Sequence, residues 1–272
     1  MKTKICISGY YGFDNFGDET ILRILIENLK KNSKSIEITV FSSNPEKTSS
    51  LYNVNSVKSF NIFKVISSLF KCDFLISGGG SLLQDVTRKK SLIYYLAIIF
   101  IALLFKKKVI IFAQGIGPVN NKFLENITVF ILKRVKNITV RDENSLNLLN
   151  SWGIKAKKCP DPVWNLNIKP KNQQTNKIGI QLRSCKSINE NFLSLLASQI
   201  CTYYKNKEIN ILSFQNSLDF EICNKLKKYI NMFDSDMNVK VIENTSNQKI
   251  IEDTASLDEL IAMRFHACLI AI

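Results

Sequence analysis

His266 is the single histidine of the 272-residue chain, and it stands two residues after Arg264. Imidazole gains and loses a proton near neutral pH, and a neighbouring guanidinium attracts anionic substrates. The apolar run Leu260–Ala262 predicts a short strand, and the residues after it predict a helix. His266 is therefore expected at a strand-to-helix junction, as a candidate general acid. A purely structural role is the alternative for a lone histidine.

Most of the ten glycines fall in three loops, each directly after an apolar run. Glycine lets the backbone approach a ligand closely, and successive backbone N–H groups bind anions or sugar hydroxyls. The loops span residues 9–17, 78–80 and 115–117, with Gly78, Gly79, Gly80, Gly115 and Gly117 as candidate ligand-binding positions. A plain tight turn is the alternative. The first loop lacks the G-x-G-x-x-G spacing of a dinucleotide fingerprint.

Polar side chains accompany the glycine loops. Asn15 lies in the first loop and Asp18 directly after it, and Gln84 and Asp85 follow the second loop. All four are candidate substrate ligands. For Asp18 the alternative is a helix N-cap, since a carboxylate at that position accepts hydrogen bonds from the free N–H groups of the first turn.

Two further arginines end predicted strands. The planar fork of Arg141 or Arg183 suits the carboxylate or phosphate of a substrate. A salt bridge to Asp142 or Glu143 is the alternative for Arg141.

Strand-like and helix-like segments alternate along the chain. In residues 1–165, strands are expected at 3–8, 36–42, 73–77, 108–114 and 138–141, and helices at 19–31, 63–71, 89–105, 123–135 and 143–151. In residues 166–272, strands are expected at 178–182, 209–214, 239–242 and 260–262, and helices at 191–204, 218–232 and from 264 onward. This alternation predicts an α/β protein with two doubly wound domains, joined by the polar linker Asn165–Lys177 and facing each other across a cleft. Ligands of such sheets bind at the carboxyl ends of the strands, where the candidate residues fall.

Charge and cysteine content limit the possible partners. The net charge of +14 suits anionic lipid or phosphorylated substrates, and no recognition motif points to nucleic acid. Seven cysteines without a C-x-x-C pair predict a reducing, cytoplasmic environment, and a zinc cluster is not expected beside a single histidine.

The most apolar segment is Leu92–Phe105, which basic residues flank on both sides. It is shorter than the roughly 20 residues of a membrane-spanning helix. We expect a helix buried on the sheet, with its basic flanks available for peripheral contact with an anionic membrane at its inner face. Because the chain ends at Ile272 within an apolar helix, the second domain is expected to be truncated.

Five motifs occur in one order along the chain: Asn15–Glu19, Gly78–Asp85, Gln114–Pro118, Val140–Ser145 and Arg264–Ala267. Together they resemble the polysaccharide pyruvyl transferases. The resemblance implies a GT-B-like pair of Rossmann-like domains. It also implies transfer of a pyruvyl group from phosphoenolpyruvate to a sugar of a cell-envelope polysaccharide, or of its lipid-linked precursor, as a ketal.

By this resemblance, His266 is the general acid and Arg141 a ligand of phosphoenolpyruvate, with Arg264 as a second cation. No metal or cofactor is implied beyond the donor itself. A nucleotide-sugar glycosyltransferase of the same architecture is the first alternative. An inactive, truncated relative that acts as a binding module is the second.

Overall fold

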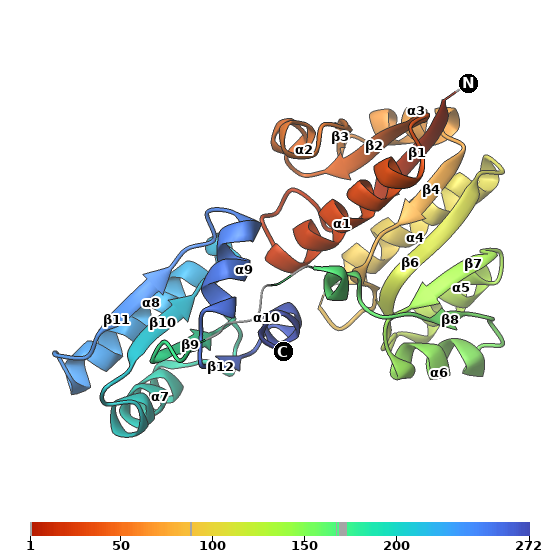
Figure 1. Cartoon of the computed structure of the whole chain (residues 1–272). Coiled ribbons are helices and arrows are strands. Elements are labelled where there is room, and N and C mark those ends of the chain that lie inside the picture. The colour runs from red at the N-terminus through yellow and green to blue at the C-terminus, as the bar shows by residue number, and fades with distance from the viewer. Residues whose placement is uncertain (1, 88, 167, 169–172) are drawn as a thin grey trace. The chain divides into compact units, whose positions relative to one another are not determined.

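Two compact units, Met1–Asn165 and Leu166–Ile272, make up the chain. The computed structural model describes residues 2–87, 89–166, 168 and 173–272, and Figure 1 shows the elements of each unit. Within the predicted linker Asn165–Lys177, positions 167 and 169–172 lie outside the described residues. Each unit is described by itself below.

The sheet of the first unit is parallel throughout. Its strands are β1 (Thr3–Ser8), β2 (Ile36–Ser42), β3 (Asn55–Lys58), β4 (Phe74–Ser77), β5 (Gly80–Leu83), β6 (Lys108–Ile116), β7 (Asn137–Val140) and β8 (Lys157–Lys158). The order is β3-β2-β1-β4-β6-β7-β8, with β5 paired to β6. All the carboxyl ends therefore point to one edge of the sheet, which places the three glycine loops on neighbouring strands β1, β4 and β6.

Helices cover both faces of this sheet. They are α1 (Phe16–Asn32), α2 (Pro45–Tyr52), α3 (Ile62–Lys71), α4 (Lys89–Leu104), α5 (Lys122–Leu132) and α6 (Glu143–Ser151), and a 3-10 turn follows at Pro162–Asn165. Apolar residues of α1 pack into one core with β1 and β2, while those of α3, α4, α5 and α6 form a second core. The central strands are buried on both faces, which explains their unbroken apolar runs.

The apolar segment expected at Leu92–Phe105 is α4, and it packs on the sheet as predicted. Leu92, Leu96 and Ile99 are buried in the core, and α4 contacts β4, β5 and β6. Within the described part of the chain, no helix combines the length and apolar character needed to cross a membrane.

The second unit repeats the arrangement on a smaller scale. Its strands are β9 (Lys177–Gln181), β10 (Glu208–Leu212), β11 (Val239–Ile242) and β12 (Glu259–Ala262), parallel and in the order β11-β10-β9-β12. Its helices are α7 (Glu190–Tyr203), α8 (Asn216–Phe233), α9 (Asn247–Ala255) and α10 (Phe265–Ala271). Isoleucines of β9 and β10 form the centre of its core with α7 and α8. Both units are therefore Rossmann-like, as the sequence predicts.

Five helices and strands were not predicted: α2, β3, β5, β8 and α9. Each is short or largely polar. In α9 only Ile250, Ile251 and Thr254 are buried, and Ser246 caps the helix by accepting a hydrogen bond from the Lys249 N–H. A segment with so few apolar residues carries too little periodicity to predict a helix.

Candidate active site

Tyr11 is the central residue of the glycine-loop edge in the first unit. Its ring is fully buried. A Cβ atom at Gly9 would lie 2.3 Å from its Cζ, and one at Gly78 would lie 1.9 Å from its hydroxyl oxygen. The first and second loops can therefore close around Tyr11 only because both positions are glycine.

Gln114 connects the second loop to the third. This fully buried side chain donates from Nε2 to Ser77 Oγ at 2.8 Å and to the Gly78 carbonyl at 2.6 Å. The three glycine loops thus meet at one edge of the sheet, as the strand-end prediction requires.

Asn15, rather than Asp18, caps α1. Its side-chain oxygen accepts a hydrogen bond from the Gly17 N–H at 3.2 Å. Asp18 lies in the first turn of the helix, and a Cβ at Gly80 would lie 2.6 Å from Asp18 Oδ1. Gly80 also has a φ of +95°, which a residue with a side chain rarely adopts. The first helix therefore brings Asp18 directly against the second glycine loop.

Glu19, which the candidate set does not include, fixes the first loop. Its carboxylate is buried, accepts a hydrogen bond from the Gly12 N–H at 2.7 Å and accepts another from the Tyr52 hydroxyl at 3.0 Å. Burial raises the pKa of this carboxyl group above its ordinary value. In the sequence, Glu19 is marked only as the last residue of the motif Asn15–Glu19, and its partner Tyr52 is distant along the chain.

Gln84 and Asp85 both bind the chain's own backbone. Gln84 Oε1 accepts hydrogen bonds from the N–H groups of Val86 and Thr87. The two oxygens of Asp85 accept from the N–H groups of Asn120 and Asn121, at 2.9 and 2.7 Å. These two bonds lower the pKa of Asp85. Both side chains thus shape the second and third loops, and a ligand role stays a prediction.

Arg141 stands at the end of β7, beside the third glycine loop. Its Nη1 pairs with Asp161 Oδ2 at 3.0 Å, and its Nη2 donates to Ser81 Oγ at 2.9 Å. A Cβ at Gly115 would lie 2.8 Å from that same Ser81 oxygen and 3.3 Å from Arg141 Nε. Arg141 therefore bridges the second and third loops.

The alternative considered for Arg141, a salt bridge to Asp142 or Glu143, is not the ion pair that the structure shows. Asp142 instead caps α6 by accepting from the Ser145 N–H at 2.8 Å, and Glu143 pairs with Lys158. The actual partner, Asp161, is buried and lies 20 positions along the chain. Nothing in the sequence connects such a distant pair.

A cavity of about 580 Å³ opens beside the third loop. Its wall includes Ser81, the 115–119 segment and the first turns of α6, and Trp152 closes one side. The Trp152 indole N–H donates to Glu125 Oε1 at 3.1 Å. This cavity lies at the same edge as Arg141 and is large enough for a small polar ligand.

Arg264 occupies the corresponding edge of the second unit, and its fork is already engaged. Nε and Nη2 bind the two oxygens of Asp219 at 2.8 and 2.7 Å, and Asp219 is fully buried. The Arg264 backbone N–H donates to Gln181 Oε1 at 2.8 Å. Arg264 therefore joins α8, β9 and the turn between β12 and α10.

His266 lies at the predicted strand-to-helix junction, in the first turn of α10 and four residues after the end of β12. The side chain is half-buried, and its ring meets the edge of Phe265 at a centroid distance of 5.3 Å. Arg183 is exposed just beyond β9, the strand that pairs with β12, and its backbone N–H contacts Met263 Sδ at 3.5 Å. The structure thus brings His266, Arg264 and Arg183 to one edge of the second sheet.

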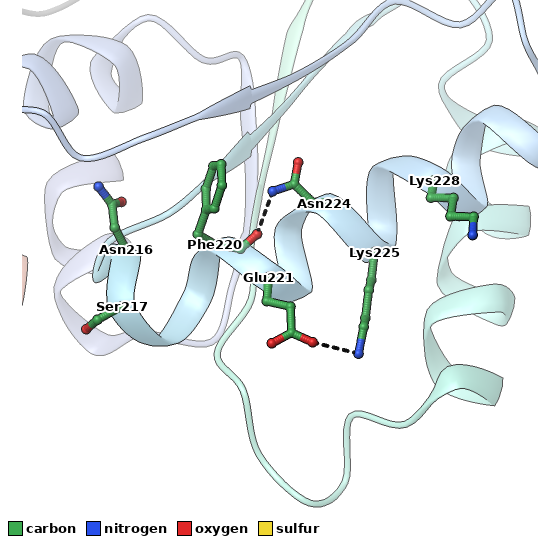
Figure 2. Close-up of a pocket in the computed structure, with 7 residues that line it drawn as sticks. All are labelled: Asn216, Ser217, Phe220, Glu221, Asn224, Lys225 and Lys228. Carbon is green, nitrogen blue, oxygen red and sulfur yellow. Dashed lines mark hydrogen bonds and ion pairs between the residues drawn. The ribbon is translucent and has the colours of Figure 1, made fainter.

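Another hollow, of about 510 Å³, lies on α8. Figure 2 shows its seven lining residues, all from this one helix, with an ion pair between Glu221 and Lys225 at 2.9 Å. It contains none of the candidate site residues. Among the described residues, no three histidine, cysteine, aspartate or glutamate side chains gather as a metal site.

Comparisons with solved structures show the fold. The UDP-GlcNAc 2-epimerase from Methanocaldococcus jannaschii aligns over 100% of this chain and 81% of its own, with a TM-score of 0.65 and 14% identity. An S. aureus MnaA–UDP structure aligns over 97% of this chain and 74% of its own, with a TM-score of 0.63 and 12% identity. A Rickettsia africae glycosyltransferase aligns over 96% of this chain and 79% of its own, with a TM-score of 0.56 and 12% identity. At such identities the likeness establishes a GT-B-type architecture and nothing about the substrate.

A search of curated protein sequences gives no match. The family model of polysaccharide pyruvyl transferases, in contrast, matches residues 15–272, nearly the whole chain and all five motifs. The chain therefore belongs to the polysaccharide pyruvyl transferase family and is a transferase with a GT-B-like fold.

Proposed function

We propose that this chain transfers a pyruvyl group from phosphoenolpyruvate to two hydroxyls of one sugar, forming a ketal in a cell-envelope polysaccharide. The family match over residues 15–272 carries the proposal. The gathering of loops and cations at the carboxyl edge of each sheet supports it, because the donor has two acidic groups and the acceptor several hydroxyls.

The reaction needs a proton donor but no redox step. Protonation of the donor's methylene carbon leaves an oxocarbenium-like centre at the neighbouring carbon, which one sugar hydroxyl attacks. The C–O bond to phosphate then breaks, and the second hydroxyl closes the ketal. One hydroxyl proton replaces the proton taken up by the methyl group, and the other leaves with phosphate or solvent.

His266 is the proposed general acid. Its support is its position: one turn of backbone separates it from β12, and Arg264 anchors that turn to Asp219 and Gln181. Because its fork is committed to a buried carboxylate, we assign Arg264 as a positioning residue for His266 rather than a direct ligand of the donor.

Arg183 is the proposed anion ligand of the second unit. Its side chain is exposed, and it forms no ion pair with the described residues. In the first unit, Arg141 is the proposed donor ligand implied by the family, held in position by Asp161 and Ser81. Since Asp161 offsets the charge of Arg141, we expect Arg183 to contribute more net attraction to an anion.

The glycine loops of the first unit are the proposed contacts for sugar hydroxyls or phosphate oxygens. We place the reaction in the cytoplasm, with a lipid-linked sugar as one acceptor class. The cysteines support that compartment, because all seven are free and several, including Cys6 and Cys72, are buried as thiols.

Isothermal titration with phosphoenolpyruvate and with UDP-sugars tests the donor. We expect phosphoenolpyruvate to bind, and binding weakened about tenfold or more in Arg183→Met, because a charge-assisted contact is lost. Arg134→Met, at an exposed position on the first unit, is the matched control and keeps the wild-type affinity. Binding of UDP-sugars with none of phosphoenolpyruvate would instead support a glycosyltransferase.

A second measurement tests His266 by phosphate release from phosphoenolpyruvate in the presence of a lipid-linked N-acetylmannosamine acceptor. We expect His266→Ala to lower turnover roughly 10²-fold or more while donor affinity stays within about threefold, because a general acid acts in the transition state. Near-normal turnover of this variant would show that the proton comes from another group.

A further inference from the structure

An exposed apolar stripe runs along α3 of the first unit. Phe63 is 87% exposed and Phe70 is 65% exposed, although both belong to a regular helix. Residues seven positions apart lie on the same side of a helix, and the buried Val65 and Leu69 lie on the opposite side. The two phenylalanines therefore point away from the core, where a helix of a soluble domain usually carries polar residues.

Neighbouring segments extend this apolar surface. Helix α4 contacts α3 and exposes Ile93 near its start and Leu104 at its end. Phe60, just before α3, is also exposed and its ring lies 5.8 Å from that of Tyr94 on α4. We call this surface the α3–α4 face, and its exposed apolar residues are Phe60, Ile62, Phe63, Phe70, Ile93 and Leu104.

The charges around the α3–α4 face are mostly positive, although the exposed Asp73 lies near Lys106–Lys108 at the end of α4. Residues 58–72 and 86–108 contain no Asp or Glu. Their lysines are Lys58, Lys64, Lys71, Lys89, Lys90, Lys106, Lys107 and Lys108. Lys107 Nζ lies 5.8 Å from the ring centroid of Phe70, and this ring in turn meets Phe105 edge-on at 5.5 Å. Cations and aromatic rings thus alternate across the same surface.

We propose that the α3–α4 face docks this protein on an anionic lipid bilayer. Aromatic side chains partition into the interfacial region of a bilayer, and lysines beside them are attracted to anionic headgroups. A second copy of this chain fits less well, because two such faces would bring lysines against lysines in a protein of net charge +14. The sequence alone placed such a contact at the basic flanks of the apolar segment that forms α4. Helix α4 itself is mostly buried, and the exposed phenylalanines assign the contact chiefly to α3.

Docking at this face has a consequence for the reaction, which rests on the proposed function. Crossover helices run antiparallel to the strands of a parallel sheet, so α3 and α4 begin at the edge where the glycine loops lie. Phe60, Ile62, Lys89 and Lys90 therefore lie toward that edge of the first unit. Contact with lipid would bring a lipid-linked sugar close to the loops.

Vesicle flotation of the full chain tests the docking without any substrate. We expect the wild type to float with vesicles of phosphatidylcholine containing about one-third phosphatidylglycerol and to stay at the bottom with phosphatidylcholine alone, because each lysine contributes through the surface potential. Lys64→Gln/Lys71→Gln should lower the partition coefficient about 25-fold, and Phe63→Ser/Phe70→Ser should lower it at least as much.

Matched controls use residues of the same types elsewhere. Lys31→Gln/Lys34→Gln changes exposed lysines at the end of α1, on the other face of the sheet, and Met232→Ser/Phe233→Ser changes exposed apolar residues of the second unit. Both should float like the wild type. Circular dichroism and thermal melting confirm that each variant is folded.

Two results would overturn the docking proposal. One is the absence of flotation with anionic vesicles. The other is an equal decrease of the partition coefficient in the control variants and in the α3 variants. Retention on immobilised polyglutamate through the same lysines, without flotation, would assign the face to an acidic protein instead. Because phosphoenolpyruvate affinity is measured separately, a chain that binds the donor but not vesicles disproves only the docking.

Discussion

At the scale of single residues, the close contact between Tyr11 and Gly78 makes a sharp prediction. Gly78→Ala would place a methyl group 1.9 Å from the Tyr11 hydroxyl oxygen, and the buried ring has no room to move. We expect loss of about 1–3 kcal/mol of unfolding free energy, measured by urea denaturation, as for other overpacked sites.

The matching variant is Tyr11→Phe. The hydroxyl of the wild-type Tyr11 is buried and makes no hydrogen bond within the described residues, so its removal alone should change the free energy of unfolding little. In Tyr11→Phe/Gly78→Ala the nearest ring atom to the new methyl group is Cζ at 3.1 Å, a contact that a small shift relieves. The double variant should therefore recover most of the loss. If it is no more stable than Gly78→Ala, the strain has another source.

At the scale of elements, Asp85 fastens the second glycine loop to the segment that leads into α5. Its ionised form accepts the N–H groups of Asn120 and Asn121, which lowers its pKa. A carboxyl group with a lowered pKa stabilises the fold above its unfolded pKa of about 3.9, and this contribution is lost as pH falls through the folded pKa. Asp85→Asn should therefore melt several degrees below the wild type at pH 7.

The difference should shrink as the pH drops below about 4, because protonated Asp85, like asparagine, keeps only one good acceptor. Melting temperatures recorded from pH 7 to pH 3 check this. Asp236→Asn, at an exposed position of the second unit, is the control and should follow the wild type throughout. If the difference in melting temperature between Asp85→Asn and the wild type does not vary with pH, the lost stability comes from altered hydrogen-bond geometry rather than from the charge of Asp85.

At the scale of the whole molecule, the two units have separate cores. Ile180 is fully buried between strands and helices of the second unit only. Ile180→Ala should cost about 2–5 kcal/mol through the cavity it leaves. Hydrogen-exchange mass spectrometry should show faster exchange in β9, β10 and β12, with the exchange of β1, β4 and β6 unchanged.

Leu195→Ala, at an exposed position on α7, is the control for this change and should leave exchange unaltered. If Ile180→Ala accelerates hydrogen exchange equally in both units, the two units unfold as one cooperative body.

Local sequence pattern determined most of the elements. Strands β1 and β2 and helix α6 have the predicted bounds, because the β-branched and apolar residues of a strand and the polar N-cap of a helix act over a few residues. The alternation of strands and helices also predicted that the strands are parallel, which brings the glycine loops to one edge of the first sheet. The family could be recognised because its five motifs are short and contiguous.

Tertiary structure alone decided how the candidate cations are engaged. Arg141 pairs with Asp161, and Arg264 pairs with Asp219, 45 positions away along the chain. Likewise, α3 rather than α4 carries the exposed phenylalanines, although α4 is the more apolar sequence. Ion pairs and burial depend on which surfaces the fold presses together, and no periodicity within one segment contains that information.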